Sequence, residues 1–207
     1  MKNLLSLGWI CATLFILGSL ILGSLLPDYS LVSMTLSEIG EVGSAFYYQW
    51  KALDTTCAIL ILLFAFGTFM FCARHQLSYM PAIFLLAFAL SNVGGSFFPS
   101  PHPLHNVFGI STTVGYFSPL IFYKYWQETL GAQFKRVSLI VFIIVITSIF
   151  FNLSPLIARS LYSMDYYGLV QRSLVYTFYL YCAYVSIKMI SFDKKQSAPL
   201  VDRMMPL

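Results

Sequence analysis

The sequence predicts an all-α membrane protein, a polytopic bundle of six transmembrane helices with both termini in the cytoplasm. Of the 207 residues, 58% are hydrophobic and only 10% are charged, whereas soluble domains are about one quarter charged. The mean hydropathy is +0.77, so the charges are too few to cover a soluble globule. The apolar residues also fall into runs of about 20, the length that crosses a hydrocarbon layer about 30 Å thick.

The six expected spans are apolar stretches with polar or proline-containing borders. They are Leu4–Leu26, Thr55–Cys72, Tyr79–Phe98, Val107–Trp126, Val137–Ile157 and Val170–Ile190. Residues 1–192 therefore form one transmembrane domain, and the polar tail of residues 193–207 is expected to be disordered. The first span follows Lys2 as a signal peptide would, but its apolar run is too long for a signal core, and we interpret it as a retained anchor.

Charge sets the expected orientation, because cytoplasmic loops of membrane proteins carry an excess of Lys and Arg. With a cytoplasmic amino terminus, the inner side receives nine of the 12 basic residues: Lys2, Arg74, Lys124, Lys135, Arg136, Lys188, Lys194, Lys195 and Arg203. The outer side receives Lys51, Arg159 and Arg172. The expected partners are membrane lipids and further copies of the chain in a homo-oligomer. Nucleic acid is excluded as a partner, since no polybasic arm is present.

The first outer link, from Pro27 to Asp54, is expected to form a short helix lying at the membrane surface. Its "TLSE" motif places Thr35 three residues before Glu38, the spacing of a capping box in which Glu38 accepts a hydrogen bond from the Thr35 amide. Asp54 directly precedes the apolar run "TTCAILILL", which predicts that it caps the second span.

The stretch "FFPSPHPLHNVFG" holds two of the chain's three histidines. Pro103 suits the first turn of a helix, which makes His102 the expected cap and places His105 in that turn. Two histidines at i and i+3 can share a face and bind zinc if a third ligand joins them. Glu38, Glu41 or Asp28 could supply that ligand if the first outer link folds inward. The alternative is that both histidines are interfacial. His105 is the better candidate for a functional role.

Arg172 lies at the outer end of the last span, where a cation is costly unless it is paired or reaches the lipid phosphates. The expected partner is a carboxylate, with Glu38 favoured, or an anionic ligand. In the fourth span, small residues recur at helical spacing and predict close helix packing: Gly109, Thr112, Gly115 and Ser118. Pro119 is expected to kink that helix.

These residues together resemble the domain-of-unknown-function 998 (DUF998) family of prokaryotic membrane proteins. The resemblance rests on "LSEIGEVGSAFY", "GGSFFPSPHPLHNVFG" and "GLVQRSLVY", and it covers nearly the whole chain. It implies a six-span bundle in a prokaryotic cytoplasmic (inner) membrane, and it marks Leu36, Ser37, Glu38, Gly40, Phe98, Pro99, His105, Gly109, Gly168 and Arg172. Many relatives carry an acidic residue shortly after the Phe-Pro pair, where this chain has Ser100, and this weakens the zinc hypothesis. The resemblance implies an architecture but no particular activity.

Two functions from different classes fit these residues. In the first, Ser37, Glu38, His105 and Arg172 form an outward-facing site for a lipid headgroup or a small anionic ligand, without a metal or cofactor. In the second, His105 and Glu38 activate water as catalytic residues of a lipid-modifying hydrolase, and Arg172 holds a lipid phosphate. This hydrolase works either without a metal or with zinc held by His102, His105 and Glu38. A transporter or transporter subunit is a weaker alternative, because no internal repeat is visible. The first function is preferred.

Overall fold

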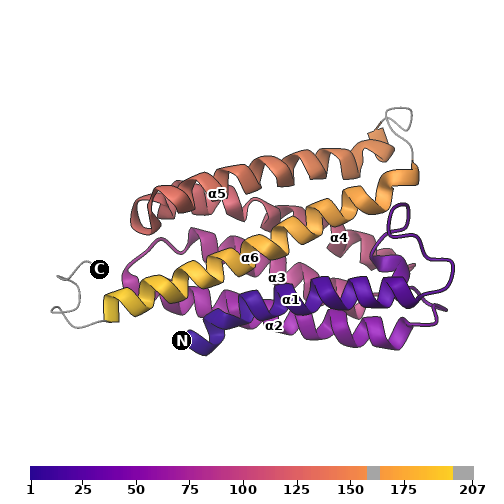
Figure 1. The fold of residues 1–207 in the computed structure, drawn as a ribbon, viewed down its shortest axis with the longest axis horizontal. Helices are drawn as coiled ribbons and strands as arrows, with labels where there is room; N and C mark the ends of the chain where they lie inside the picture. The colour runs from indigo at the N-terminus through magenta and orange to yellow at the C-terminus, as the bar shows by residue number, and fades with distance from the viewer. Residues whose placement is uncertain (158–163, 198–207) are drawn as a thin grey trace.

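The computed structural model describes residues 1–157 and 164–197, and every regular element in this part of the chain is helical. The long helices are α1 (Lys2–Leu25), α2 (Tyr47–His75), α3 (Met80–Phe97), α4 (Pro103–Tyr116), α5 (Ser118–Ile157) and α6 (Tyr167–Ser197). Two short 3₁₀ helices, η1 (Ser37–Gly40) and η3 (Met164–Tyr166), accompany them. The long helices follow the long axis of an elongated bundle (Figure 1). The predicted all-α class is confirmed for these residues.

Helix α5 is a hairpin of two helical arms rather than one rod. Phe122 and Phe134 are twelve positions apart, which a straight helix would separate by about 18 Å, yet their ring centroids lie 6.0 Å apart. The rings of Phe117 and Phe142 also meet, at 5.9 Å. The chain reverses at Gly131, whose backbone (φ 86°, ψ 175°) is a conformation that glycine adopts far more readily than other residues.

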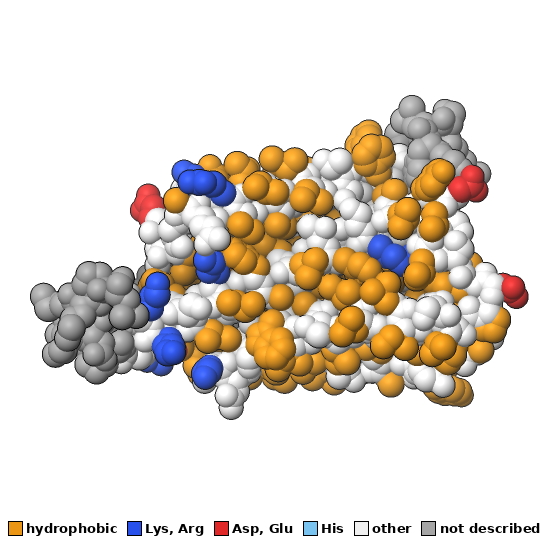
Figure 2. Space-filling model, in the orientation of Figure 1, with side chains coloured by type: hydrophobic (Ala, Val, Ile, Leu, Met, Phe, Trp, Pro, Cys, Tyr) orange, Lys and Arg blue, Asp and Glu red, His pale blue; other side chains and the backbone are white. Residues whose placement is uncertain are grey.

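Within the residues that the structure describes, five helical stretches are long and apolar enough to cross a membrane. One of them, Pro103–Ser154, contains 52 residues, or about 78 Å of continuous helix, more than twice the thickness of a hydrocarbon layer. The reversal at Gly131 divides this stretch. On the face shown in Figure 2, hydrophobic side chains cover most of the length of the bundle, and Lys and Arg side chains gather at the end that holds the amino terminus. The protein is thus a helical membrane bundle.

The two ends of the bundle differ in structure (Figure 1). The loop end contains residues 26–46 between α1 and α2, residues 98–102 between α3 and α4, and the start of α6. The opposite end contains the amino terminus, the connection from α2 to α3, the reversal at Gly131 and the last turns of α6.

Aromatic stacking and hydroxyl pairs hold the helices together. Phe15 stacks on Tyr179, and Phe88 packs on Phe178, each pair with ring centroids 4.4 Å apart. The Tyr176 and Ser19 hydroxyls lie 2.8 Å apart. Such contacts matter in a bundle that faces lipid, because apolar side chains gain little there from leaving water and helix association depends on packing and hydrogen bonds.

Two local predictions differ from the structure, and a third is confirmed. The first outer link forms only the single turn η1 instead of a surface helix, and its last part, residues 47–54, belongs to α2, which begins at Tyr47. Residues 193–197, which we assigned to the tail, continue α6, whereas residues 198–207 lie outside the described residues. The predicted kink before Pro119 is confirmed, since α4 ends at Tyr116 and α5 begins at Ser118. Arg159 lies outside the described residues.

Candidate functional site

A pocket of about 280 Å³, including its open mouth, lies at the loop end of the bundle. Helices α2 and α3, the first turn of α4 and the 3₁₀ helix η1 supply its walls. The side chains that give it chemical character are Ser37, Trp50, Lys51, Asp54, Ser96 and His105. Ser37 and His105 were predicted site residues, whereas Glu38 and Arg172 do not line the pocket.

Asp54 is the acidic side chain of the pocket, and the prediction that it caps a helix is wrong. Helix α2 begins at Tyr47, so Asp54 lies about two turns inside it, on a half-buried wall position. Within the described chain, no group donates a hydrogen bond to its carboxylate and no cation forms an ion pair with it. Lys51, one turn earlier, is exposed and lies over the Tyr47 ring, 5.8 Å from its centroid.

His105 faces the pocket from the first turn of α4. The helix begins as predicted, with Pro103 in its first turn and His102 as its cap, since the Leu104 amide donates to the His102 Nδ1 at 3.2 Å. The Nδ1 of His105 lies 2.9 Å from the carbonyl oxygen of Phe98. A carbonyl only accepts, so Nδ1 carries the hydrogen, and in the neutral ring Nε2 is left as an acceptor.

Glu38 serves the loop rather than the pocket. Its carboxylate accepts hydrogen bonds from the Thr35 amide and, at 2.7 Å, from the Thr35 hydroxyl. The predicted hydrogen bond from the Thr35 amide to Glu38 is therefore confirmed, although Leu36 rather than Thr35 is the cap of the single turn η1. The Ser37 hydroxyl lies 3.2 Å from the same Thr35 hydroxyl.

Arg172 is a buried anchor for the loop. Only 5% of its surface is exposed, and its Nη1 donates to the carbonyl oxygens of Leu31 and Met34, both at 2.7 Å, and of Gly168 at 3.0 Å. Its Nη2 donates to the Tyr29 hydroxyl, which in turn donates to the Thr35 carbonyl at 2.6 Å. The expected ion pair with Glu38 is wrong: the guanidinium contacts carbonyls and a phenol instead.

The first turns of α6 add further contacts to the same loop, and together with Arg172 we call them the loop clamp (Gly168, Leu169, Gln171 and Arg172). The Leu169 amide donates to the Val32 carbonyl at 2.9 Å, and the Gln171 side-chain oxygen accepts from the Leu36 amide at 2.7 Å. Burial raises the pKa of the Tyr29 hydroxyl to about 12, although Arg172 opposes this shift. Tyr29 is therefore protonated at neutral pH and able to donate, as its bond to Thr35 requires.

The structure does not assemble the zinc site that the sequence suggested. In residues 1–157 and 164–197, no three His, Cys, Asp or Glu side chains are grouped so that they could hold a metal ion. His102, His105 and Glu38 are each engaged with a backbone group of their own segment. The ligand-binding and catalytic roles of Glu38, His105, Arg172 and Ser37 stay predictions.

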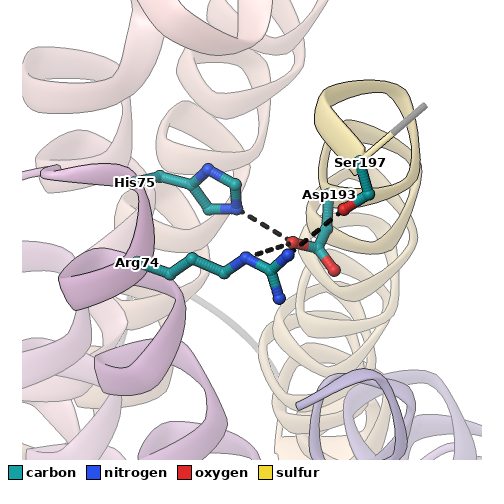
Figure 3. Close-up of polar contacts among 4 residues, drawn as sticks. All are labelled: Arg74, His75, Asp193 and Ser197. Atoms are coloured by element: carbon teal, nitrogen blue, oxygen red, sulfur yellow. Dashed lines mark hydrogen bonds and ion pairs between the residues drawn. The ribbon is translucent and has the colours of Figure 1, made fainter. Parts of the chain in front are cut away.

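A second polar cluster lies at the opposite end, where sequence analysis placed no site (Figure 3). The carboxylate of Asp193 in α6 contacts the Nε2 of His75 at 3.0 Å and the Nε of Arg74 at 3.3 Å. Arg74 also donates to the Ser197 hydroxyl at 3.2 Å. The His75 ring packs between Phe71 and Phe192, with centroids 4.6 and 5.1 Å away. This cluster ties the last turn of α2 to the end of α6.

Changing Asp193 to Asn is expected to lower the free energy of unfolding by about 1 kcal/mol, because the amide replaces a charge-assisted contact to His75 with a weaker one. Thermal unfolding in detergent measures the change. The matched control is Asp28→Asn, which removes an exposed carboxylate at a positive-φ position that Asn tolerates. Equal melting temperatures for the two variants would show that the cluster does not hold α2 to α6.

Comparison with protein families gives one match. A family described as "Protein of unknown function (DUF998)" matches residues 9–188. No curated protein and no solved structure matches the chain.

Proposed function

The chain belongs to the DUF998 family, and from its structure we propose a six-span protein of a prokaryotic cytoplasmic membrane that binds a lipid headgroup in the loop-end pocket. Dividing the 52-residue stretch Pro103–Ser154 at Gly131 gives two crossings, and the other four long stretches give one each. The gathering of Lys and Arg at the end with the amino terminus supports a cytoplasmic position for that end. The pocket then opens on the outer side.

The observation that carries this proposal is the Asp54 carboxylate in the pocket wall. A charged group that is half removed from water is costly unless it is paired, and a titratable group near the hydrocarbon boundary is a functional-site candidate by default. The described protein supplies no donor to this carboxylate. An external ligand at the level of the headgroups would supply it.

The loop clamp supports the same proposal, because it fixes the wall of the pocket. Arg172 and Gln171 hold the segment that leads directly into Ser37 and Gly40, and both of these line the pocket. Both Nη atoms of Arg172 donate to backbone carbonyls or to the Tyr29 hydroxyl, and its Nε is buried without a partner. Because Arg172 holds the loop and does not line the pocket, it is assigned to positioning the wall rather than to the ligand. His105 and Ser37 remain as ligand-contacting candidates.

Replacing Gly95 with Leu is expected to empty the pocket of ligand. Gly95 lines the pocket, and a Cβ placed there meets no atom within 4 Å, so a side chain can leave the backbone at this lining position without a clash. Native mass spectrometry of the detergent-purified protein is expected to show a bound phospholipid in the wild type and little in Gly95→Leu. The matched control is Gly109→Leu, where a Cβ also meets open space but outside the pocket. Equal lipid occupancy in all three proteins would refute headgroup binding in this pocket.

A further inference from the structure

Resting on the headgroup-binding function proposed above, we infer that the ligand carries a primary ammonium group that donates its hydrogen bonds to Asp54. In the membrane, the source of such a group is a phospholipid with an ethanolamine headgroup. A small soluble amine carries the same chemistry. This replaces the small anionic ligand considered from the sequence.

Around Asp54, three side chains of the pocket offer hydrogen-bond acceptors: Asp54, Ser96 and His105. The Asp54 carboxylate can only accept. The Nδ1 hydrogen of His105 is already committed to the Phe98 carbonyl, which leaves Nε2 as an acceptor in the neutral ring. The Ser96 hydroxyl donates to the Val93 carbonyl at 2.9 Å, so its lone pairs are what it offers to a ligand. An ammonium group has three donors and no acceptor, and so it complements these groups.

The charges around the pocket favour the same ligand. Arg172 is enclosed by the loop carbonyls, and no Lys or Arg of the described chain forms an ion pair with Asp54. Trp50 lines the pocket as well, and an indole ring adds attraction for a cation. The Asp54 carboxylate therefore lies in the pocket without an ion-pair partner and beside an aromatic side chain.

Lys51 is placed to bind the phosphate of an ethanolamine headgroup. It lies at the pocket, exposed and three positions before Asp54, and residues at this spacing have Cβ atoms about 5–6 Å apart on one helix face. An ethanolamine headgroup carries its ammonium two carbon atoms from a phosphate oxygen, a similar separation of opposite charges. With the ammonium at Asp54, the phosphate is within reach of the flexible Lys51 side chain.

The test is a titration of purified, delipidated protein with four probes, followed by native mass spectrometry. The probes are short-chain phosphatidylethanolamine, phosphatidylcholine, phosphatidylglycerol and soluble O-phosphoethanolamine. The wild type is expected to bind phosphatidylethanolamine about tenfold or more tightly than phosphatidylcholine, whose quaternary ammonium has no N–H to donate. Asp54→Asn, which is nearly isosteric, is expected to abolish this preference. The matched control Glu41→Gln, an exposed loop carboxylate outside the pocket, is expected to retain it.

Delipidated Asp54→Asn is expected to melt at or above the temperature of the wild type, because the substitution removes a charge that has no partner. This melting temperature would show that the variant loses binding although it is still folded. Binding of no lipid at all would overturn the headgroup function and the inference together. Equal binding of phosphatidylethanolamine and phosphatidylcholine, a preference for phosphatidylglycerol, or an unchanged preference in Asp54→Asn would overturn the ammonium inference alone, provided that Gly95→Leu still blocks binding. O-phosphoethanolamine binding as tightly as the lipid would support the ammonium and assign it to a soluble ligand.

Discussion

Truncation of Arg172 to alanine is expected to release the loop of residues 29–36 and to lower the free energy of unfolding by about 3 kcal/mol. The side chain is 5% exposed and bonds three carbonyls and the Tyr29 hydroxyl. Its removal leaves the carbonyl oxygens of Leu31 and Met34 without these donors in a partly buried place, and such losses cost about 1–3 kcal/mol each. Arg172→Lys keeps the charge but loses the planar fork, and it is expected to recover only part of the difference.

Thermal unfolding in detergent and protease cleavage within residues 26–46 measure the effect of the Arg172 variants. The matched control is Arg136→Ala, which removes an exposed arginine from the hairpin α5 and is expected to change neither quantity. If Arg172 instead held an external anion, Arg172→Ala would leave the loop protected and the melting temperature unchanged in ligand-free protein. That result would contradict the loop clamp.

Gly168 provides a second test of the loop clamp in which the Arg172 side chain is retained. A Cβ on Gly168 would lie 2.3 Å from the Met34 carbonyl oxygen, 2.8 Å from that of Val32 and 2.8 Å from the Nη1 of Arg172. Because two of these obstacles are backbone atoms of the loop, Gly168→Ala forces the loop away from α6 and crowds the guanidinium that holds it. We expect it to increase protease cleavage of the loop in the same way as Arg172→Ala. If the loop of Gly168→Ala stays protected from the protease, the loop and α6 are further apart at Gly168 than in the structure.

The fold was largely predictable because a membrane-spanning helix needs an apolar composition along its whole length, and such long apolar runs can be recognised in the sequence. Both ends of α1 and α3 and the start of α6 were located within a few residues, since lipid exposure demands about 20 apolar residues whatever the neighbours are. The His102 cap and the Thr35–Glu38 hydrogen bond were also predictable, because their partners lie within three positions in the sequence. The start of α2 was not, because the polar residues before Asp54 continue the helix beyond the apolar run.

The candidate site was only partly predictable, because its contacts join segments far apart in the sequence. The chemistry of Arg172 indicated that it needs a partner, but its partners are the carbonyls of residues 31 and 34, and a backbone carbonyl leaves no signature in a sequence. Asp54 was interpreted as a helix cap. The start of α2 at Tyr47 shows that Asp54 lies inside the helix, and the pocket lining shows that it lies in the pocket wall. The signal available was the i, i+3 pair of Lys51 and Asp54 next to Trp50, which a search for clustered charges on one helix face would have found.

The small residues of α4 lead to the last prediction, because the two glycines of this helix have opposite surroundings. A Cβ on Gly115 would lie 2.3 Å from the Cβ and 2.6 Å from the Cα of Phe88, so α3 and α4 touch there at backbone distance. A Cβ on Gly109 meets no atom within 4 Å. The predicted small-residue stripe therefore works at Gly115, where α4 meets α3, and not at Gly109.

Gly115→Ala is expected to lower the free energy of unfolding by about 3 kcal/mol, since the obstacle is partly backbone and cannot move aside as a flexible side chain would. Gly109→Ala, the matched control in the same helix, is expected to be neutral or to stabilise the protein by up to about 1 kcal/mol, because alanine favours helix over glycine. Thermal unfolding in detergent separates the two. If the two variants have the same melting temperature, α3 and α4 are not in contact at Gly115. The first turn of α4, which carries His105 into the pocket, would then lack the support from α3 on which its position depends.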